Sequence, residues 1–308
     1  AVCCVLAVVA GLLVLVYVFF GGMRGTAWAN AMQTIVFMAL GVITFLVIAR
    51  GIGGQDSLLG SMQAATSTAN PERLTRAAIP KSIYFSYLLI PLSVAMFPHV
   101  FQHWLTARQS STFKLPIVMH PLFVLIVWLP CVLIGVWATS PEANLPAGIR
   151  PNLVLPTLVR NEAGELLAGF LSAGSLAAIM SSLDSQFLCI GTMFTQDVVL
   201  RPGRAGRIDE RTKLLMSRLF VVAVVAVTYL VSLLPIVRSV FPLAIWCLSG
   251  FTGLFPLVFA ALYWRRLTLA GATASVATAI AIWTYCFMQS KFGTDRHYYF
   301  PQFLDRWG

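Results

Sequence analysis

The chain has 308 residues, of which 58% are hydrophobic and only 10% are charged. Soluble domains carry about 25% charged residues, so this composition excludes a soluble globular domain, and it also excludes a disordered chain. Basic residues outnumber acidic residues by 21 to 11, which gives a formal net charge of +10. No basic patch with interleaved aromatic residues accompanies that charge, so we expect no nucleic-acid partner. The composition instead predicts a polytopic membrane protein.

Eight stretches without Asp, Glu, Lys or Arg predict membrane-spanning helices, because a helix needs about 20 apolar residues to cross the hydrocarbon core. Their all-round apolarity argues against barrel strands, which alternate over about 10 residues. The stretches are 2–20, 27–49, 82–107, 115–138, 166–183, 219–237, 239–264 and 267–290. We expect the fifth stretch to continue helically past Asp184 to about residue 197. The sequence therefore predicts an all-α fold with about eight transmembrane helices.

The charges of the connecting segments predict the orientation of these helices. Four short connections fall on one side of the membrane: 21–26, 108–114, 198–218 and 265–266. The connection at 198–218 alone carries six Lys and Arg residues. Short loops rich in Lys and Arg stay in the cytoplasm, so we expect these four connections inside. The longer connections at 50–80 and 139–165 have room for short extra helices outside.

The chain begins within the first apolar stretch, with no initiator Met and no signal peptide. We therefore expect a partial chain that lacks its N-terminal helices. Residues 1–308 are expected to form one transmembrane domain in the plasma (inner) membrane. The lipid bilayer is the first expected partner, and we expect a monomer.

The densest polar cluster inside an apolar stretch reads SAGSLAAIMSSLDS, residues 172–185. On a helix, Ala178, Ser181, Ser182 and Ser185 fall within an arc of about 100°, with Asp184 beside it. Hydroxyls and main-chain carbonyls on one face suit a weakly held monovalent cation such as sodium. Asp184 would tune that site, bind a second cation or carry a proton. The alternative is that the small residues only allow close helix packing, but a mid-membrane carboxylate rarely serves packing and favours an ion site.

Two further groups of polar residues enter the apolar stretches. Asn30 and Gln33 lie three residues apart on one helix face, where they would line an ion pathway or hydrogen-bond between helices. His99 and His103 lie four apart and would supply half a metal site, but no Glu lies between them and no second ligand pair is found. Gln102 would instead anchor its helix or line a pathway.

The stretch 239–264 is expected to form a bent or broken helix, because Pro and Gly recur within it. These residues are Pro242, Gly250, Gly253 and Pro256. Broken helices expose backbone carbonyls and are tolerated only against protein or a water-filled path. We therefore expect Trp246 and Ser249, just before the break, to line a substrate pathway together with Phe97, His99 and Gln102.

Four segments resemble motifs of the sodium/solute symporter family, which contains sodium-coupled sugar, proline, pantothenate and iodide carriers. Residues 177–199, AAIMSSLDSQFLCIGTMFTQDVV, are similar to its signature helix. Residues 21–33, GGMRGTAWANAMQ, resemble its Gly-Gly turn followed by a Trp-Thr-Asp-x-x-Gln helix start. Residues 97–110, FPHVFQHWLTARQS, resemble its Pro-His and Gln-Arg stretch, and residues 263–272, YWRRLTLAGA, match the basic pair common after its tenth core helix.

The resemblance implies a LeuT-type fold of two inverted five-helix repeats, of which this chain would supply core helices four to eleven. It implies sodium as the coupling ion, bound by the carbonyl of Ala178 and the hydroxyls of Ser181 and Ser182, and no organic cofactor. Two positions depart from the family pattern. Asn30 stands where the family has an Asp, and His103 stands where it has an Arg.

The function that the resemblance implies is secondary active transport, in which sodium drives symport of a small organic solute by alternating access. A membrane sensor built on a transporter-like domain and a proton-coupled carrier are the alternatives. We do not expect an enzyme: an intramembrane hydrolase needs an activated Ser with a base or a metal site, and neither GxSxG nor HExxH occurs.

Overall fold

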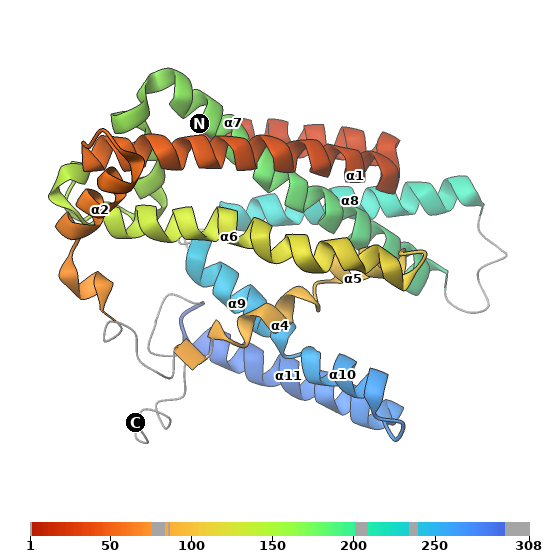
Figure 1. Cartoon of the computed structure of the whole chain (residues 1–308). Coiled ribbons are helices and arrows are strands. Elements are labelled where there is room, and N and C mark those ends of the chain that lie inside the picture. The colour runs from red at the N-terminus through yellow and green to blue at the C-terminus, as the bar shows by residue number, and fades with distance from the viewer. Residues whose placement is uncertain (1, 76–83, 86, 201–208, 234–239, 293–308) are drawn as a thin grey trace. The chain divides into compact units, whose positions relative to one another are not determined.

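The computed structural model describes residues 2–75, 84–85, 87–200, 209–233 and 240–292, and the regular elements within these ranges are all helical (Figure 1). Contacts divide the chain into two compact units. Unit 1 comprises Ala1–Arg76 and Ala107–Val225, and unit 2 comprises Ala77–Thr106 and Ala226–Gly308.

Unit 1 is built on long helices rich in Ala, Leu, Val and Met. They are α1 (Val2–Gly53), α2 (Leu58–Thr68), α6 (Lys114–Trp137), α7 (Pro151–Met193) and the first part of α8 (Glu210–Ser232). Helix α1 packs most extensively against α7 and also contacts α2 and α6, and Figure 1 shows α1, α6 and α7 running alongside one another. Helix α7 passes into a π-helical turn at Phe194–Val199, so the fifth predicted helix does extend as far as expected.

The best-buried part of unit 1 lies where α2 and the start of α7 meet the ends of α1 and α6. Trp137 is fully buried there, stacks on Phe45 with ring centroids 5.4 Å apart, and donates a hydrogen bond from Nε1 to Thr66 Oγ1 at 3.0 Å. The connections predicted to carry extra helices do so, with 3₁₀ turns at Pro71–Leu74 and Pro141–Ala143 in addition to α2. Within α7, Gly164 has φ 72°, a left-handed conformation that favours glycine and kinks the helix before its apolar part.

Unit 2 contains short helices and one long one. They are α4 (Ile90–Val94), α5 (Pro98–Leu105), α9 (Val240–Thr252), α10 (Phe255–Tyr263) and α11 (Leu269–Gln289). Helix α4 packs against α9, and α11 contacts both α9 and α10. The break between α9 and α10 confirms the broken helix predicted for 239–264.

Residues 82–107 do not form the single continuous span that we predicted. Helix α4 ends at Val94 and α5 begins at Pro98, with Phe97 extended at φ −62° and ψ 122°. Proline has no N–H to continue a helix and disfavours helical backbone in the residue before it. Pro98 therefore ends one helix and starts the next inside an apolar stretch whose composition alone indicated a continuous helix.

Residues 21–26, predicted to connect the first two spans, have helical backbone within α1, and Figure 1 shows α1 doubling back on itself. With 52 residues, α1 exceeds twice the roughly 20 needed for one crossing.

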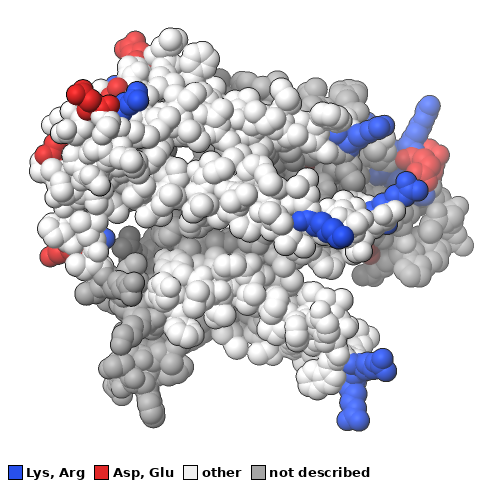
Figure 2. Space-filling view, viewed as in Figure 1, with Lys and Arg blue, Asp and Glu red and all other residues white. Residues whose placement is uncertain are grey.

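Six helical stretches in the described part of the chain are long and apolar enough to cross a membrane. They are Arg24–Gly53, Ser110–Trp137, Pro151–Val199, Glu210–Ser232, Val240–Tyr263 and Leu269–Gln289. Large apolar side chains are widely exposed on them, as expected for surfaces that face lipid rather than water. Figure 2 shows the charged side chains of unit 1 gathered toward helix ends, with an uncharged surface between them. The protein is thus an all-helical, polytopic membrane protein.

Candidate ion-binding site

The serine-rich face of α7 carries the oxygen atoms that the sequence analysis predicted as cation ligands. Ser182 Oγ lies 3.5 Å from the carbonyl oxygen of Ala178, one turn earlier on the helix. That distance is at the limit for an O–H···O hydrogen bond, so the pair is only weakly engaged. Ser182 is exposed, whereas Ala178 and Ser181 are half-buried. Both oxygens of the pair therefore lie on one face of α7.

A small groove reaches this face within unit 1. It has a volume of about 160 Å³, lies between α1, α6 and α7, and is lined by Ala178 together with Thr44, Gly174 and Ser175 among others. Thr44 is 3% exposed, and its hydroxyl has no hydrogen-bond partner within the described ranges. Gly174 fits there because a Cβ would lie 2.8 Å from Leu40 Cδ1. Small residues on α7 therefore bring α1 close to it.

Asp184 and Ser185 lie on the face of α7 that packs against α1. Asp184 is completely buried and Ser185 is 8% exposed. The side chain of Asn30 reaches them from α1, so the two helices share a polar contact inside their apolar stretches. An intramembrane carboxylate is expensive to bury, which marks a functional site by default.

The Asn30 amide bridges three residues of α7 when it is oriented to satisfy its hydrogen bonds. Its oxygen accepts from Ser185 Oγ at 2.9 Å, and its nitrogen donates to Asp184 Oδ2 at 3.2 Å. The nitrogen also lies 3.3 Å from Ser181 Oγ and 3.2 Å from the Ser181 carbonyl oxygen. A single neutral side chain therefore contacts both the carboxylate and one of the serines predicted to bind sodium.

Gln33 lies one turn further along α1. Its Oε1 is buried without a hydrogen-bond partner among the described residues. An unsatisfied buried acceptor costs about 1–3 kcal/mol, so this oxygen is suited to receive a proton donor or a cation. The structure thus places Asn30 against the predicted ion ligands and leaves an acceptor on Gln33 next to it on the same helix.

The residues predicted for a substrate pathway lie in unit 2 and form two groups. In the first, the ring of Phe97, at the break before α5, packs against Phe251 at a centroid distance of 4.6 Å and against His99 at 5.5 Å. Gln102 follows His99 on α5 and is half-buried. Phe251 was not singled out in the sequence, although it lies in the same Gly- and Pro-rich segment.

The second group joins α9 to α11. Trp283 Nε1 donates to the carbonyl oxygen of Trp246 at 2.9 Å and lies 3.2 Å from Ser249 Oγ. Ser249 Oγ in turn donates to the Trp246 carbonyl at 2.8 Å. A Cβ on Gly250 would meet Trp283 Nε1 at 3.1 Å, so glycine leaves room for the indole. Trp246 and Ser249 are therefore occupied in helix packing, and Trp283 is the partner that sequence reasoning missed.

Comparison with known proteins shows where these motifs belong. The model of the sodium:solute symporter family matches residues 3–278. The uncharacterized symporter YwcA of Bacillus subtilis is 23% identical over 273 residues, which cover 86% of this chain and 53% of that protein. The sodium/sialic acid symporter SiaT of Proteus mirabilis is 23% identical over 317 residues, covering 96% of this chain and 61% of SiaT.

A solved structure has the same fold. It is the substrate-bound outward-open state of a Na⁺-coupled sialic acid symporter, with a TM-score of 0.64 and 18% identity, covering 91% of this chain and 65% of that one. This chain spans about half to three fifths of the length of the relatives described above. The family match over residues 3–278 covers most of the sequence, so the protein is a multi-pass membrane protein of the sodium:solute symporter family.

Proposed function

We propose that this chain forms the sodium-binding half of a secondary active transporter that couples sodium to symport of a small organic solute. It would do so as core helices four to eleven of a LeuT-type fold in the plasma membrane. The observation that carries the proposal is the polar contact between α1 and α7, where Asn30 meets Asp184 and Ser181 inside apolar stretches. Such polar groups in membrane spans mark ion and substrate pathways.

Sodium would bind on the α7 face through the Ala178 carbonyl and the hydroxyls of Ser181 and Ser182. Neutral oxygens hold a monovalent cation weakly enough to release it in each cycle. Asp184 would supply the negative charge nearby, and the Asn30 amide would hold its carboxylate toward Ser181 at the distances observed. Asn30 lacks the negative charge of the Asp that the family has at this position, and the carboxylate of Asp184 on α7 would supply a negative charge in its place.

The broken helices of unit 2 support alternating access. Secondary transporters of this type bind solute beside discontinuous helices near the bilayer midplane. Breaks occur between α4 and α5 and between α9 and α10, next to Phe97 and Phe251. We propose that the solute pathway runs beside these breaks. α1 has enough residues for two crossings, and 82–107 would cross as a broken helix, which would bring the spans to eight.

A proton-coupled carrier is the second candidate, because Asp184 is completely buried. A buried carboxylate can be neutralised by a proton as well as by a cation. The two candidates share one site and differ in the ion that stabilises it.

Sodium-dependent thermal stabilisation of the full chain in detergent tests the proposal. A ligand present at 100 times its dissociation constant stabilises the native state by about 2.7 kcal/mol. We expect sodium, but not potassium or choline, to raise the melting temperature, and Ser181→Ala to abolish that rise. Ser172→Ala is the matched control, because Ser172 lies on the same helix and is exposed, and among the described residues its hydroxyl donates only to the Ala168 carbonyl of its own helix, at 2.8 Å.

The outcomes separate the candidates. A rise that depends on pH rather than sodium, and that Asp184→Asn abolishes, would identify the proton-coupled carrier. No rise with either ion would refute both, and would point to a sensor.

A further inference from the structure

Helix α10 carries a row of aromatic side chains on one face. Phe255, Phe259 and Tyr263 recur every four residues, with centroids 6.0 Å apart for the first pair and 4.8 Å for the second. Tyr263 is 73% exposed and Phe259 is 54% exposed. Residues four apart lie above one another on a helix, so the rings form a continuous apolar ladder that ends at the last residue of α10.

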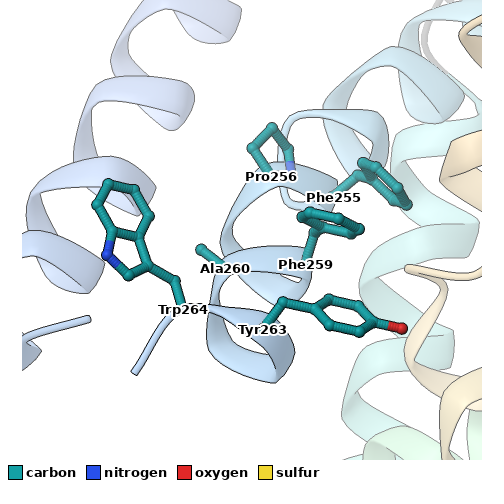
Figure 3. Close-up of a pocket in the computed structure, with 6 residues that line it drawn as sticks. All are labelled: Phe255, Pro256, Phe259, Ala260, Tyr263 and Trp264. Atoms are coloured by element: carbon teal, nitrogen blue, oxygen red, sulfur yellow. The ribbon is translucent and has the colours of Figure 1, made fainter. Parts of the chain in front are cut away.

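A groove of about 480 Å³ runs beside this ladder. Six residues line it: Phe255, Pro256, Phe259, Ala260, Tyr263 and Trp264. Figure 3 shows the indole of Trp264 directed to the opposite side from the phenyl and phenol rings, with the small side chains of Pro256 and Ala260 between them. The groove is therefore lined almost wholly by apolar side chains, an environment that accommodates a hydrocarbon chain.

Two arginines stand at the end of the groove. Trp264 N–H donates to the Ala260 carbonyl at 2.8 Å, and Leu267 N–H donates to the Trp264 carbonyl at 3.1 Å. These bonds close a tight turn between α10 and α11 whose tip is Arg265 and Arg266, both exposed. The partial negative charge at the C-terminal end of α10 and the partial positive charge at the N-terminal end of α11 offset each other here. The two guanidinium groups therefore make the turn positively charged.

Little in the sequence of unit 2 offsets that positive charge. Neither residues 77–106 nor residues 226–294 contain an Asp or a Glu. The positive-inside rule places the 265–266 turn on the cytoplasmic side, where the membrane leaflet carries anionic lipids. Tyr and Trp at the end of an apolar helix are typical of the membrane–water interface.

We propose that the α10–α11 turn binds an anionic phospholipid, with one acyl chain in the aromatic groove and the phosphate on Arg265 and Arg266. Transfer of an acyl chain from the bilayer to the groove exchanges one apolar environment for another and contributes little binding free energy. The groove therefore determines where the lipid lies but does not distinguish one headgroup from another. The preference comes from the arginines, because a guanidinium pairs bidentately with phosphate oxygens. This site is separate from ion coupling and does not rest on it.

Lipid retention by the purified full chain tests the headgroup preference. Native mass spectrometry would compare retention of phosphatidylglycerol and phosphatidylcholine of identical acyl chains. We expect the wild type to retain the anionic lipid preferentially, and Arg265→Gln/Arg266→Gln to lose about tenfold or more in its apparent affinity, since each basic residue near a surface contributes about a factor of five. Arg108→Gln/Lys114→Gln removes the same charge from another connection on the expected cytoplasmic side and should retain the preference.

Fluorescence quenching locates the bound lipid. Brominated phosphatidylglycerol should quench the emission of Trp264, obtained as the difference between wild type and Trp264→Phe, more than brominated phosphatidylcholine does. Equal retention of both lipids, or a preference untouched in Arg265→Gln/Arg266→Gln, would overturn the proposal. Anionic selectivity without headgroup-dependent quenching of Trp264 would place the lipid elsewhere and would overturn it as well.

Discussion

Replacing Asn30 by Asp is expected to make the stability of the protein strongly dependent on sodium. The amide nitrogen of Asn30 lies 3.2 Å from Asp184 Oδ2, so an Asp side chain would place a second carboxylate oxygen at that distance. Two unit charges 3.2 Å apart repel by about 5 kcal/mol at an effective dielectric constant of 20. The substitution also removes a donor to a charged acceptor, which contributes about 1.5–3 kcal/mol.

A bound cation or a proton relieves most of that repulsion. The free energy of unfolding of Asn30→Asp should therefore fall by several kcal/mol in choline at pH 8 and recover in sodium. The assay is the melting temperature in detergent across a sodium titration, repeated at pH 6 to separate protons from sodium. Asn30→Leu removes the amide without adding charge, and it should not increase the sodium dependence.

The exchanged pair Asn30→Asp/Asp184→Asn is the decisive variant. It keeps one carboxylate and one amide in contact and reverses only the helix that carries each. Stability and sodium response near those of the wild type are expected. A melting temperature of the exchanged pair no higher than that of the less stable single variant would contradict a direct contact between the two side chains. An equal melting temperature of Asn30→Asp in sodium and in choline would contradict it as well.

Two substitutions test the packing of unit 1 by thermal unfolding in detergent. Trp137→Phe removes the hydrogen bond to Thr66 and leaves a small cavity at a fully buried position, so the free energy of unfolding should fall by about 2–4 kcal/mol. An unchanged melting temperature would mean that this contact does not hold α2 in place. Gly53→Ala places a Cβ against the Ser61 backbone and should destabilise by about 1–3 kcal/mol, whereas Gly21→Ala, with open space around it, should be neutral or stabilising. Equal effects of the two glycine substitutions would contradict the close approach of α1 and α2.

The apolar stretches were sufficient to predict most of the helices, because in hydrocarbon each backbone polar group must be satisfied within its own helix. The helix that carries Ser181 and Asp184 extends to the end that the sequence indicated, and the break between α9 and α10 follows from Gly253 and Pro256. Local rules also explain the error at 82–107. Apolarity permits a continuous helix there, but Pro98 acts directly on the backbone and breaks it.

The polar contacts between helices could not be obtained in the same way. Asn30 and Ser185 are 155 residues apart in the sequence, and helical periodicity gives the face on which each lies but not the face it meets. The same holds for Trp283, whose indole reaches Trp246 and Ser249 only because Gly250 leaves space on α9.

The sequence by itself determined that the protein crosses a membrane, which segments are apolar, and which polar residues share one face of α7, since these properties depend on neighbours within one helix. Only the tertiary structure decided that the amide of Asn30 is held against the carboxylate of Asp184. That pairing depends on how two helices pack, and small residues such as Gly174 set the distance at which they approach.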